Sequence, residues 1–391
     1  MSYCGDAIDD ARGKHLSPID PIKLSQDLIR CPSITPQNAG ALEVLEHALT
    51  SLGFACERFD FEGICNLYAK KGSGSPHLCF AGHTDVVPLG DAALWTHPPF
   101  QGDIHDGQLW GRGAADMKCA IAAFVSALAQ HTIFQGTVSL LITGDEEGEA
   151  LHGTQRVLPL LAGRGDIPDL CLIGEPTCDL KIGDTLKIGR RGSITGKLTC
   201  YGKQGHIAYP QNTDNPIPRM IACLKTLYSH SFDKGTDLFE PTRFEVTSVD
   251  VGNTASNIIP HKIEARFGIR LNTLQKTEEI CQLLRTICSN EGGDHDLTLT
   301  THGNAFLTED REKVSLIQKA VQTVTGSLPA LNTTGGTTDG RFINAYCPVV
   351  ECGMTEETMH QVDEHVSLED IRKLTDIYAA ILKNFFDKGH A

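Results

Sequence analysis

The chain has 391 residues, of which 40% are hydrophobic and 21% are charged, so it is long enough for two domains with separate cores. Its formal net charge of -15 argues against general binding to nucleic-acid phosphates, which requires a basic surface. The 14 cysteines are scattered and form no CxxC pair, which predicts reduced, mostly buried thiols in a cytoplasmic protein rather than a disulfide framework.

Neither a leader nor a membrane anchor is expected from the first residues of the chain. Residues 1–16 are polar and are predicted to form a loose extension, and residues 1–14 contain no apolar stretch typical of a secretory signal. The longest apolar run, residues 119–129, contains Ser126 and is too short to cross a bilayer. We therefore expect a buried helix at 119–129 and no membrane partner.

From residue 20 to residue 173, helical and strand patterns alternate along the chain. Pro18 and Pro21 favour the start of a helix near Asp20. Helices are predicted at 20–30, 41–52, 113–131 and 153–162, and strands at 76–81, 137–143 and 169–173. Strand, helix and strand at this spacing predict βαβ units and a mostly parallel sheet.

After Gly189-Arg190-Arg191-Gly192 the pattern changes to alternating apolar and polar residues, which is typical of strands with one exposed face. Strands are predicted at 193–201, 243–251, 262–272 and 296–302, and helices at 215–228 and 277–290. The predicted fold class is therefore α/β, with an α+β sandwich domain at 192–302 inserted between two parts of a mostly parallel-sheet domain, at 1–191 and 303–391. The larger domain ends with a helix at 311–325, a strand at 348–351 and a helix at 368–386.

Potential metal ligands follow the ends of several predicted strands, beginning with His83 and Asp85. These residues lie two positions apart, so they point to the same side from the carboxyl end of a strand, where open α/β sheets place their sites. His83 could offer a metal a neutral ring nitrogen while Asp85 holds the other ring N–H. Taken alone, such a pair is more often part of an ordinary turn.

The other strand-end candidates are Asp116, Asp145-Glu146-Glu147 and Glu175. Asp116 could equally cap a helix, Glu175 could lie in a simple turn, and the three adjacent carboxylates could form a solvated loop. However, adjacent carboxylates repel unless a cation or a proton lies among them, and four successive strand ends or helix starts offer such groups. Carboxylates and imidazole without thiolates fit zinc, cobalt or manganese.

If two metals bind, Asp116 is the natural bridging ligand, with the ions about 3.5–4 Å apart. A last ligand is then needed from the C-terminal part of the chain, and His360 and His365 are the candidates.

The sequence also resembles a known family through four motifs. They are Gly82-His83-Thr84-Asp85, residues 111–118 (GRGAADMK), residues 144–147 (GDEE) and Gly174-Glu175-Pro176.

These motifs resemble the dizinc aminoacylase/carboxypeptidase family of the M20 type, and the resemblance runs from residue 18 to the C-terminus. It implies two Zn²⁺ ions, which Co²⁺ could replace. His83 and Glu175 would hold one ion, Glu147 and His360 would hold the other, and Asp116 would bridge both. His360 is preferred to the alternative histidine because it occupies the Thr-x-His position of the family, which leaves His365 as a nearby surface or loop residue.

The resemblance also implies catalytic roles for three other residues. Glu146 would be the general base, and Asp85 would orient the histidine ligand. His206 would reach the active site of the partner subunit in a homodimer formed through the inserted domain, which would also act as a lid. On the residues alone, His206 is better explained as a loop histidine.

Three further segments, 189–193, 335–342 and 358–364, resemble the branch of the family that hydrolyses N-succinyl-LL-2,6-diaminopimelate to succinate and LL-2,6-diaminopimelate in lysine biosynthesis. Arginine binds carboxylates in a bidentate manner, and Gly335-Gly336-Thr337 could form a backbone nest for a carboxylate. The implied substrate contacts are Arg190, Ser193, Tyr209, Asn257, Arg270, Gly336 and Thr337. The arginines alone are more often ordinary strand-end charges, and the glycine pair could be a turn.

Glu356 and Glu357 depart from the family pattern, because extra negative charge beside an anionic substrate is unexpected.

The alternatives within the family are an acetylornithine deacetylase or another M20-type deacylase or peptidase. The segments 189–193 and 335–342 favour the succinylated substrate. An alternative of another class is a metal-dependent binding protein without activity. The presence of Asp85 and Glu146, which would bind no metal themselves, argues against it.

Overall fold

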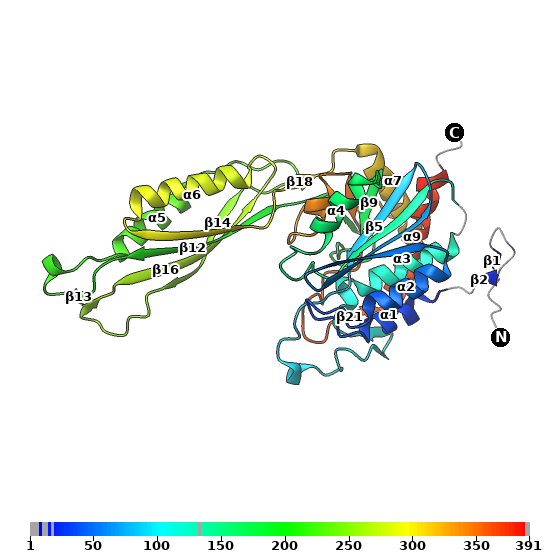
Figure 1. The fold of residues 1–391 in the computed structure, drawn as a ribbon, viewed down its shortest axis with the longest axis horizontal. Coiled ribbons are helices and arrows are strands. Elements are labelled where there is room, and N and C mark those ends of the chain that lie inside the picture. The colour runs from blue at the N-terminus through cyan, green and yellow to red at the C-terminus, as the bar shows by residue number, and fades with distance from the viewer. Residues whose placement is uncertain (1–7, 10–14, 17–18, 132–133, 388–391) are drawn as a thin grey trace. The chain divides into compact units, whose positions relative to one another are not determined.

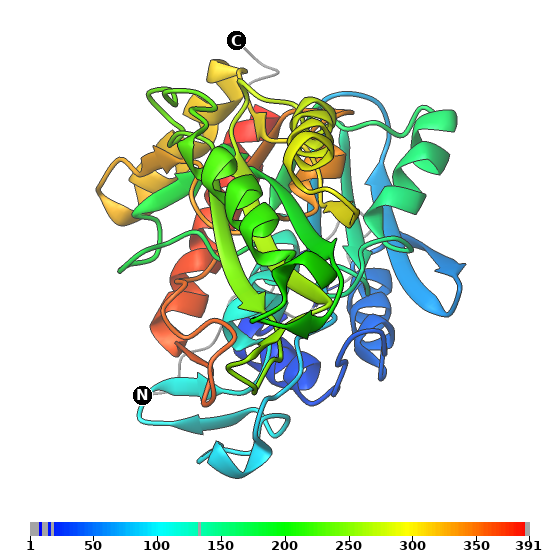
Figure 2. The ribbon, with the colours of Figure 1, turned by 90° about the vertical axis from the view of Figure 1, so that its left-hand side faces the viewer.

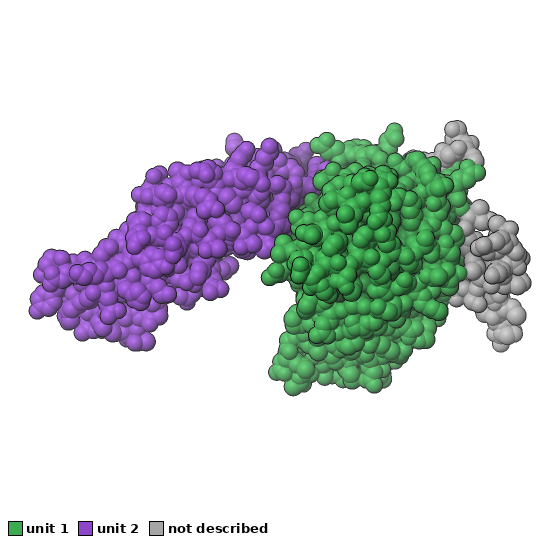
Figure 3. Space-filling model, in the orientation of Figure 1, with its two compact units in different colours: residues 1–188, 308–332, 338–391 green, residues 189–307, 333–337 purple. Residues whose placement is uncertain are grey.

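The computed structural model describes residues 8–9, 15–16, 19–131 and 134–387 (Figure 1). The extension predicted at 1–16 therefore lies mostly outside the described residues. Within it, β1 (Ile8–Asp9) and β2 (His15–Leu16) pair in an antiparallel manner. The chain forms two compact units, coloured separately in Figure 3. Unit 1 comprises residues 1–188, 308–332 and 338–391, and unit 2 comprises residues 189–307 and 333–337.

Unit 1 is built on an eight-stranded sheet with the strand order β19-β10-β20-β9-β5-β8-β4-β3. The central run β20-β9-β5-β8 is parallel, whereas β4 and β3 continue from β8 as an antiparallel hairpin. The strands are β3 (Ala55–Phe61), β4 (Ile64–Gly72), β5 (His77–His83), β8 (Thr137–Thr143), β9 (Leu170–Ile173), β10 (Thr185–Lys187), β19 (Ala330–Asn332) and β20 (Val349–Glu351). The mostly parallel sheet predicted for the larger domain is confirmed in its central strands.

Helices cover both faces of this sheet, which explains why its central strands are buried along almost their whole length. On one face Phe80 of β5 stacks on Phe124 at 4.2 Å between ring centroids and meets Tyr378 edge-on at 5.7 Å. On the other face Leu158 and Ile343 lie over the sheet. The helices of unit 1 are α1 (Pro21–Ile29), α2 (Ala41–Ser51), α3 (Cys119–Gln130), α4 (Thr154–Gly163), α7 (Arg311–Thr325), α8 (Gly340–Ile343) and α9 (Leu368–Asp387).

The segment before α3 differs from the continuous helix predicted at 113–131. A short turn, η2 (Ala114–Lys118), precedes the helix, and Asp116 within it has the non-helical angles φ −126° and ψ 98°. Gly113 begins this turn with φ +88°, a left-handed conformation that glycine adopts without strain. The chain is therefore bent at Asp116, and the regular helix begins only at Cys119.

Unit 2 contains a four-stranded antiparallel sheet in the order β14-β16-β12-β17. Its strands are β14 (Arg243–Asp250), β16 (Lys262–Leu271), β12 (Gly192–Tyr201) and β17 (His295–Thr301). The helices α5 (Ile217–Ser229) and α6 (Thr277–Glu291) lie side by side on it (Figures 1 and 2), with Met220 and Leu284 in the same buried core as Leu198. The predicted α+β arrangement with one covered face is confirmed.

Several short elements complete the two units. They are η1 (Ala92–Leu94), β6 (Asp103–His105), β7 (Gln108–Trp110) and β21 (His365–Ser367) in unit 1, and β11 (Gly189–Arg190), β13 (Gly205–His206), η3 (Pro210–Asn212), β15 (Ile258–Ile259) and β18 (Phe306–Leu307) in unit 2. Among the described helices, none combines the length and the apolar character that crossing a bilayer would require. The cysteines within the described ranges are free thiols, and most are buried, as the sequence predicted.

Candidate metal centre

Three neighbouring parallel strands bring the predicted ligands to one edge of the sheet. His83 is the last residue of β5, Glu175 follows β9, and Glu147 follows β8, while β9, β5 and β8 are adjacent. Because parallel strands share the direction of their carboxyl ends, these side chains emerge at the same edge. Asp116 reaches this edge from the bent turn before α3, and His360 from the segment between β20 and β21.

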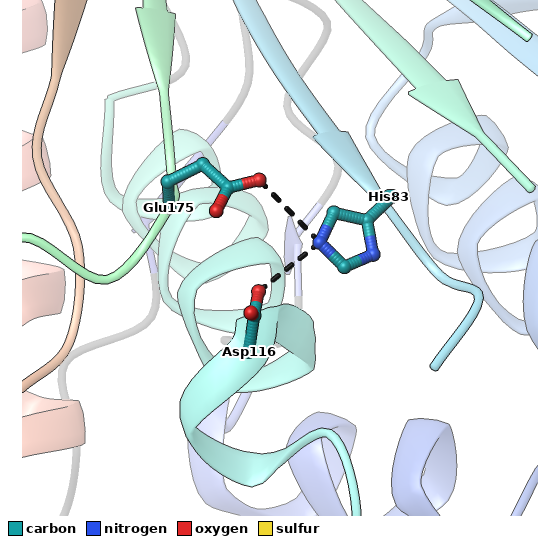
Figure 4. A group of neighbouring side chains, drawn as sticks. All are labelled: His83, Asp116 and Glu175. Carbon is teal, nitrogen blue, oxygen red and sulfur yellow. Dashed lines mark hydrogen bonds and ion pairs between the residues drawn. The ribbon is translucent and has the colours of Figure 1, made fainter. Parts of the chain in front are cut away.

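The first donor group consists of His83, Asp116 and Glu175 (Figure 4). Nε2 of His83 lies 3.1 Å from Oδ1 of Asp116 and 3.4 Å from Oε1 of Glu175. The other ring nitrogen, Nδ1, lies 2.8 Å from the main-chain oxygen of Asp85, which fixes the ring with Nε2 towards the two carboxylates. All three side chains of the group are buried.

The second donor group consists of Asp116, Glu147 and His360. Nε2 of His360 lies 2.8 Å from Oε1 of Glu147 and 3.1 Å from Oδ2 of Asp116. Asp116 therefore belongs to both groups and uses a different carboxylate oxygen in each. Within each group the ligand atoms lie within 4.8 Å of one another. Imidazole nitrogens and carboxylate oxygens in this arrangement fit a pair of divalent transition-metal ions.

The electrostatics of the two groups show that they need positive charge. Burial, with the nearby charge of Asp116, raises the pKa of Glu175 to about 7. Hydrogen bonds to Asp116 and Glu147 raise the pKa of His360 to about 10. Desolvation, followed by the charge of Glu175, raises the pKa of Glu146 well above its ordinary value. Protons on the histidines thus balance the carboxylates, and divalent cations would displace these protons.

The carboxylate of Asp85 lies elsewhere than the sequence interpretation expected. It is 3.7 Å from the Nδ1 atom of His83, and the main-chain carbonyl of Asp85 makes the close contact to that ring instead. The two carboxylate oxygens accept hydrogen bonds from the main-chain N–H groups of Glu146 at 3.2 Å and Glu147 at 3.0 Å. Asp85 therefore orients the histidine with its backbone and holds the acidic loop with its side chain.

The three adjacent carboxylates after β8 have different surroundings. Asp145 accepts a hydrogen bond from the main-chain N–H of His152 at 2.9 Å and so closes the acidic loop. Glu147 joins the second donor group. The main chain of Glu146 is held by Asp85, while within the described residues no hydrogen bond to its carboxylate is found. Glu146 is thus the member of the three with a side chain available for proton transfer.

The predicted substrate contacts lie in unit 2, whereas both donor groups lie in unit 1. Arg190 is buried and donates to the main-chain oxygens of Thr334 at 3.1 Å and Gly336 at 3.4 Å. This places it beside the segment that contains Thr337. Arg270 donates a hydrogen bond to Oγ of Ser193 across neighbouring strands.

The other candidates of unit 2 lie around β13. Nδ1 of His206 accepts a hydrogen bond from the N–H of Ala208 at 3.0 Å, and its ring lies 5.8 Å from that of Tyr209. Asn257 uses its main-chain oxygen to accept the N–H of Ile207 at 3.1 Å. Three separate sets therefore form in unit 2, around Arg190, Arg270 and His206.

The structure also explains the unexpected charge before His360. Glu356 pairs with the ammonium group of Lys187, whose side chain is fully buried, so its charge is balanced inside unit 1. Glu357 is exposed. His365 lies outside both donor groups and stacks on Trp110 with 4.0 Å between ring centroids.

Sequence reasoning missed Arg112 and Glu364, although both lie in motifs that carried the family resemblance. They form a fully buried ion pair with 2.7 Å between Nη1 and Oε2. The available signal was a charged residue inside each motif without an assigned role, because a charge in a buried segment needs a partner. The pairing itself joins residues 252 positions apart, which no local pattern reveals.

A sequence model of Peptidase family M20/M25/M40 matches residues 79–384. The chain therefore belongs to this family. Among curated relatives, it is 50% identical over 381 residues to the succinyl-diaminopimelate desuccinylase of Parvibaculum lavamentivorans, covering 95% of this chain and 96% of the relative. It is 49% identical over 372 residues to the protein of the same name from Caulobacter vibrioides strain NA1000 / CB15N, covering 94% of this chain and 96% of the relative.

Solved structures of low sequence identity share the fold. The M20 family metallo-carboxypeptidase Sso-CP2 from Sulfolobus solfataricus has a TM-score of 0.80 at 18% identity, covering 94% of this chain and 99% of that chain. The Bacillus subtilis protein YXEP, described as a dinuclear metal binding peptidase of the M20 family, has a TM-score of 0.68 at 17% identity, covering 94% and 98%.

Replacing Asp85 with asparagine tests the role of its side chain. An amide has one acceptor oxygen, whereas the carboxylate serves two N–H groups, so Asp85→Asn should loosen the acidic loop and weaken zinc binding about tenfold or more. Zinc affinity would be measured by competition with a chromophoric chelator. Asp91→Asn, which alters an exposed carboxylate that also accepts a main-chain N–H, is the control. Unchanged zinc affinity in Asp85→Asn would contradict the role.

Metal binding should release protons near neutral pH. A pKa of about 10 means that the ring of His360 keeps a proton below that pH in the metal-free protein, and a cation must displace it. Affinity for zinc should therefore rise with pH towards about 10. Zinc titration in weakly buffered solution should acidify it, and His360→Ala should release fewer protons. His105→Ala, at an exposed histidine outside both groups, should match the wild type. Equal proton release by His360→Ala would contradict this assignment.

Proposed function

We propose that this protein is a dizinc hydrolase that cleaves the amide bond of N-succinyl-LL-2,6-diaminopimelate, giving succinate and LL-2,6-diaminopimelate for lysine biosynthesis. The observation that carries the proposal is the pair of donor groups that share Asp116, with Glu146 beside them. The named relatives at about half identity over nearly the whole chain support the choice of substrate.

The proposed ligands of the two Zn²⁺ ions, which Co²⁺ could replace, are the members of the two donor groups. His83, Asp116 and Glu175 would hold one ion, and Asp116, Glu147 and His360 would hold the other. Bound there, two divalent cations would polarise the amide carbonyl and lower the pKa of water. The absence of thiolates from both groups supports a catalytic rather than a purely structural zinc site.

Glu146 is the proposed general base. Its carboxylate takes a proton from the attacking water as the water oxygen bonds to the amide carbon. The same carboxylate then returns the proton to the amine nitrogen as the carbon–nitrogen bond breaks. Asp85 keeps Glu146 in place through the hydrogen bond to its main-chain N–H at 3.2 Å, which leaves the side chain of Glu146 free for the transfer.

The substrate carries three carboxylates, so its site requires fixed donors. We assign carboxylate binding to Arg270 with Ser193, and to Arg190 with the backbone of Gly336 and Thr337. The polar side chains of Tyr209 and Asn257 are proposed to make further contacts. Burial fixes the position of the Arg190 guanidinium, which supports its role in orientation. The balance of Glu356 by Lys187 removes the objection that an extra negative charge would repel the substrate.

A homodimer formed through unit 2 is also part of the proposal. In it, His206 of one subunit would donate a hydrogen bond to the developing oxyanion in the site of the other. Ile207 and Tyr209, neighbours of His206, are 58% and 57% exposed, and such exposed apolar side chains support an interface there. The free and mostly buried cysteines support a reducing, cytoplasmic location.

Replacing Glu146 with alanine tests the general base. Zinc-loaded Glu146→Ala should bind the wild-type amount of metal but lose about 10²- to 10⁴-fold in kcat, because only proton transfer is removed. Succinate release and zinc content would be measured on the same samples. Glu149→Ala, an exposed carboxylate of the same loop, should retain activity. Wild-type kcat in Glu146→Ala would rule out this role.

Side-by-side turnover of candidate substrates tests the substrate. Zinc-loaded protein should release succinate from N-succinyl-LL-2,6-diaminopimelate and should hydrolyse N-acetylornithine and dipeptides far more slowly. The reason is that the proposed arginine contacts fit the carboxylates of the succinylated compound. Turnover of N-acetylornithine or a dipeptide without succinate release would retain the hydrolase mechanism and reject the substrate.

A further inference from the structure

Arg112 and Glu364 form an ion pair in the interior of unit 1. Their side chains are 2% and 0% exposed, and Nη1 of Arg112 lies 2.7 Å from Oε2 of Glu364. A buried pair of this kind is weak support for stability, because desolvation of both charges offsets most of their attraction. Its contacts to other groups therefore have to explain what it does.

Arg112 contacts the backbone of the segment that carries His360. Its Nη1 atom also donates to the main-chain oxygen of Gln361 at 3.1 Å, and Nη2 donates to those of Pro88 at 3.3 Å and His360 at 3.5 Å. The guanidinium also lies 5.1 Å from the ring centroid of Trp95. The planar guanidinium of Arg112 thus holds the backbone of the segment that contains His360, a proposed ligand of the second cation.

Glu364 makes the corresponding contacts to the segment that carries Asp116. Its second oxygen, Oε1, accepts the main-chain N–H groups of Ala115 at 2.8 Å and Asp116 at 3.2 Å. Its main-chain oxygen accepts the N–H of Gly111 at 2.9 Å. The ion pair therefore joins two segments that are distant in sequence, and each segment carries one member of the second donor group.

The backbone around His360 needs such support. His360 and Asp363 have φ values of 61° and 59°, a left-handed conformation that is strained for a non-glycine residue. The carboxylate of Asp363 accepts hydrogen bonds from both the N–H and the hydroxyl of Thr96, at 2.8 and 2.7 Å. The surrounding contacts, and not the local sequence, therefore hold this segment in place.

We propose that Arg112 and Glu364 are positioning residues that set the spacing between Asp116 and His360, so that the second donor group is formed before a cation arrives. This inference rests on the proposed function, because it takes these residues as metal ligands. The first donor group depends less on the ion pair, since Glu364 contacts only Asp116 among its three members, while His83 and Glu175 are carried by neighbouring strands of the sheet.

Zinc binding to Arg112→Lys and Glu364→Gln tests the proposal. Lysine keeps the charge but lacks the fork that serves a carboxylate and several carbonyls, and glutamine keeps the shape but pairs poorly with arginine. Each variant should bind the second zinc equivalent about ten- to hundred-fold more weakly, while the first equivalent changes much less. Stepwise zinc affinity would be measured by chelator competition, and folding by circular dichroism.

The matched control is Arg164→Lys, which alters an exposed arginine–glutamate pair of the same unit. Arg164 and Glu57 lie 2.6 Å apart and have 47% and 45% exposed side chains. This control should bind both zinc equivalents as the wild type does. Equal weakening of both equivalents in Arg112→Lys and Glu364→Gln would overturn the proposal and show a general structural role. Unchanged affinity for the second equivalent would also overturn it.

A double variant keeps the test decisive if a single change prevents folding. Arg112→Met with Glu364→Gln leaves no unpaired buried charge, so it should fold and still lose affinity for the second equivalent. Wild-type affinity in the folded double variant would overturn the proposal.

Measurements on the wild type separate this proposal from the proposed substrate. Wild-type protein that binds two zinc ions but releases no succinate would reject only the proposed substrate. Weak binding of two ions by the wild type would reject the metal centre and the positioning role together.

Discussion

The two carboxylate oxygens of Asp116 each contact a different histidine, and segments from distant parts of unit 1 converge on this one side chain. A turn that departs from helical geometry presents it, and a buried helix continues directly behind it. The ends of adjacent parallel strands supply His83 and Glu175 on one side. Glu147 and His360 approach from the other side. A carboxylate surrounded in this way keeps its charge only because cationic groups lie against both oxygens.

Charges inside unit 1 follow the same rule. Lys118 is fully buried and donates to the main-chain oxygen of Cys31 at 2.8 Å, Lys187 pairs with Glu356, and Arg112 pairs with Glu364. Because buried charges are tolerated only with well-placed partners, each one restricts how the surrounding segments can move. These contacts tie together the segments around the donor groups, which suits proposed ligands that must adopt one geometry.

The sequence predicted the central strands, the long helices and the inserted unit, because their apolar patterns are continuous and local. It missed the hairpin of β3 and β4, whose mixed polar and apolar residues form no continuous apolar run. It also missed β10 and β19, which have three residues each and are defined by pairing between distant parts of the chain. The candidate ligands could be named from strand ends and motifs. The actual contact of the Asp85 carboxylate could not be predicted from the sequence, since it depends on which N–H groups the folded loop presents.

The position of unit 2 within the sequence separates His360 from the other members of the two donor groups. His83, Asp116 and Glu175 all precede it, whereas the second group joins Asp116 to a histidine 244 positions later. During synthesis from the N-terminus, every ligand of the first group is therefore made before the inserted unit begins. The second group becomes complete only after His360 has been made, so any product truncated before residue 360 lacks it. Occupancy of both groups would thus report that synthesis has passed residue 360.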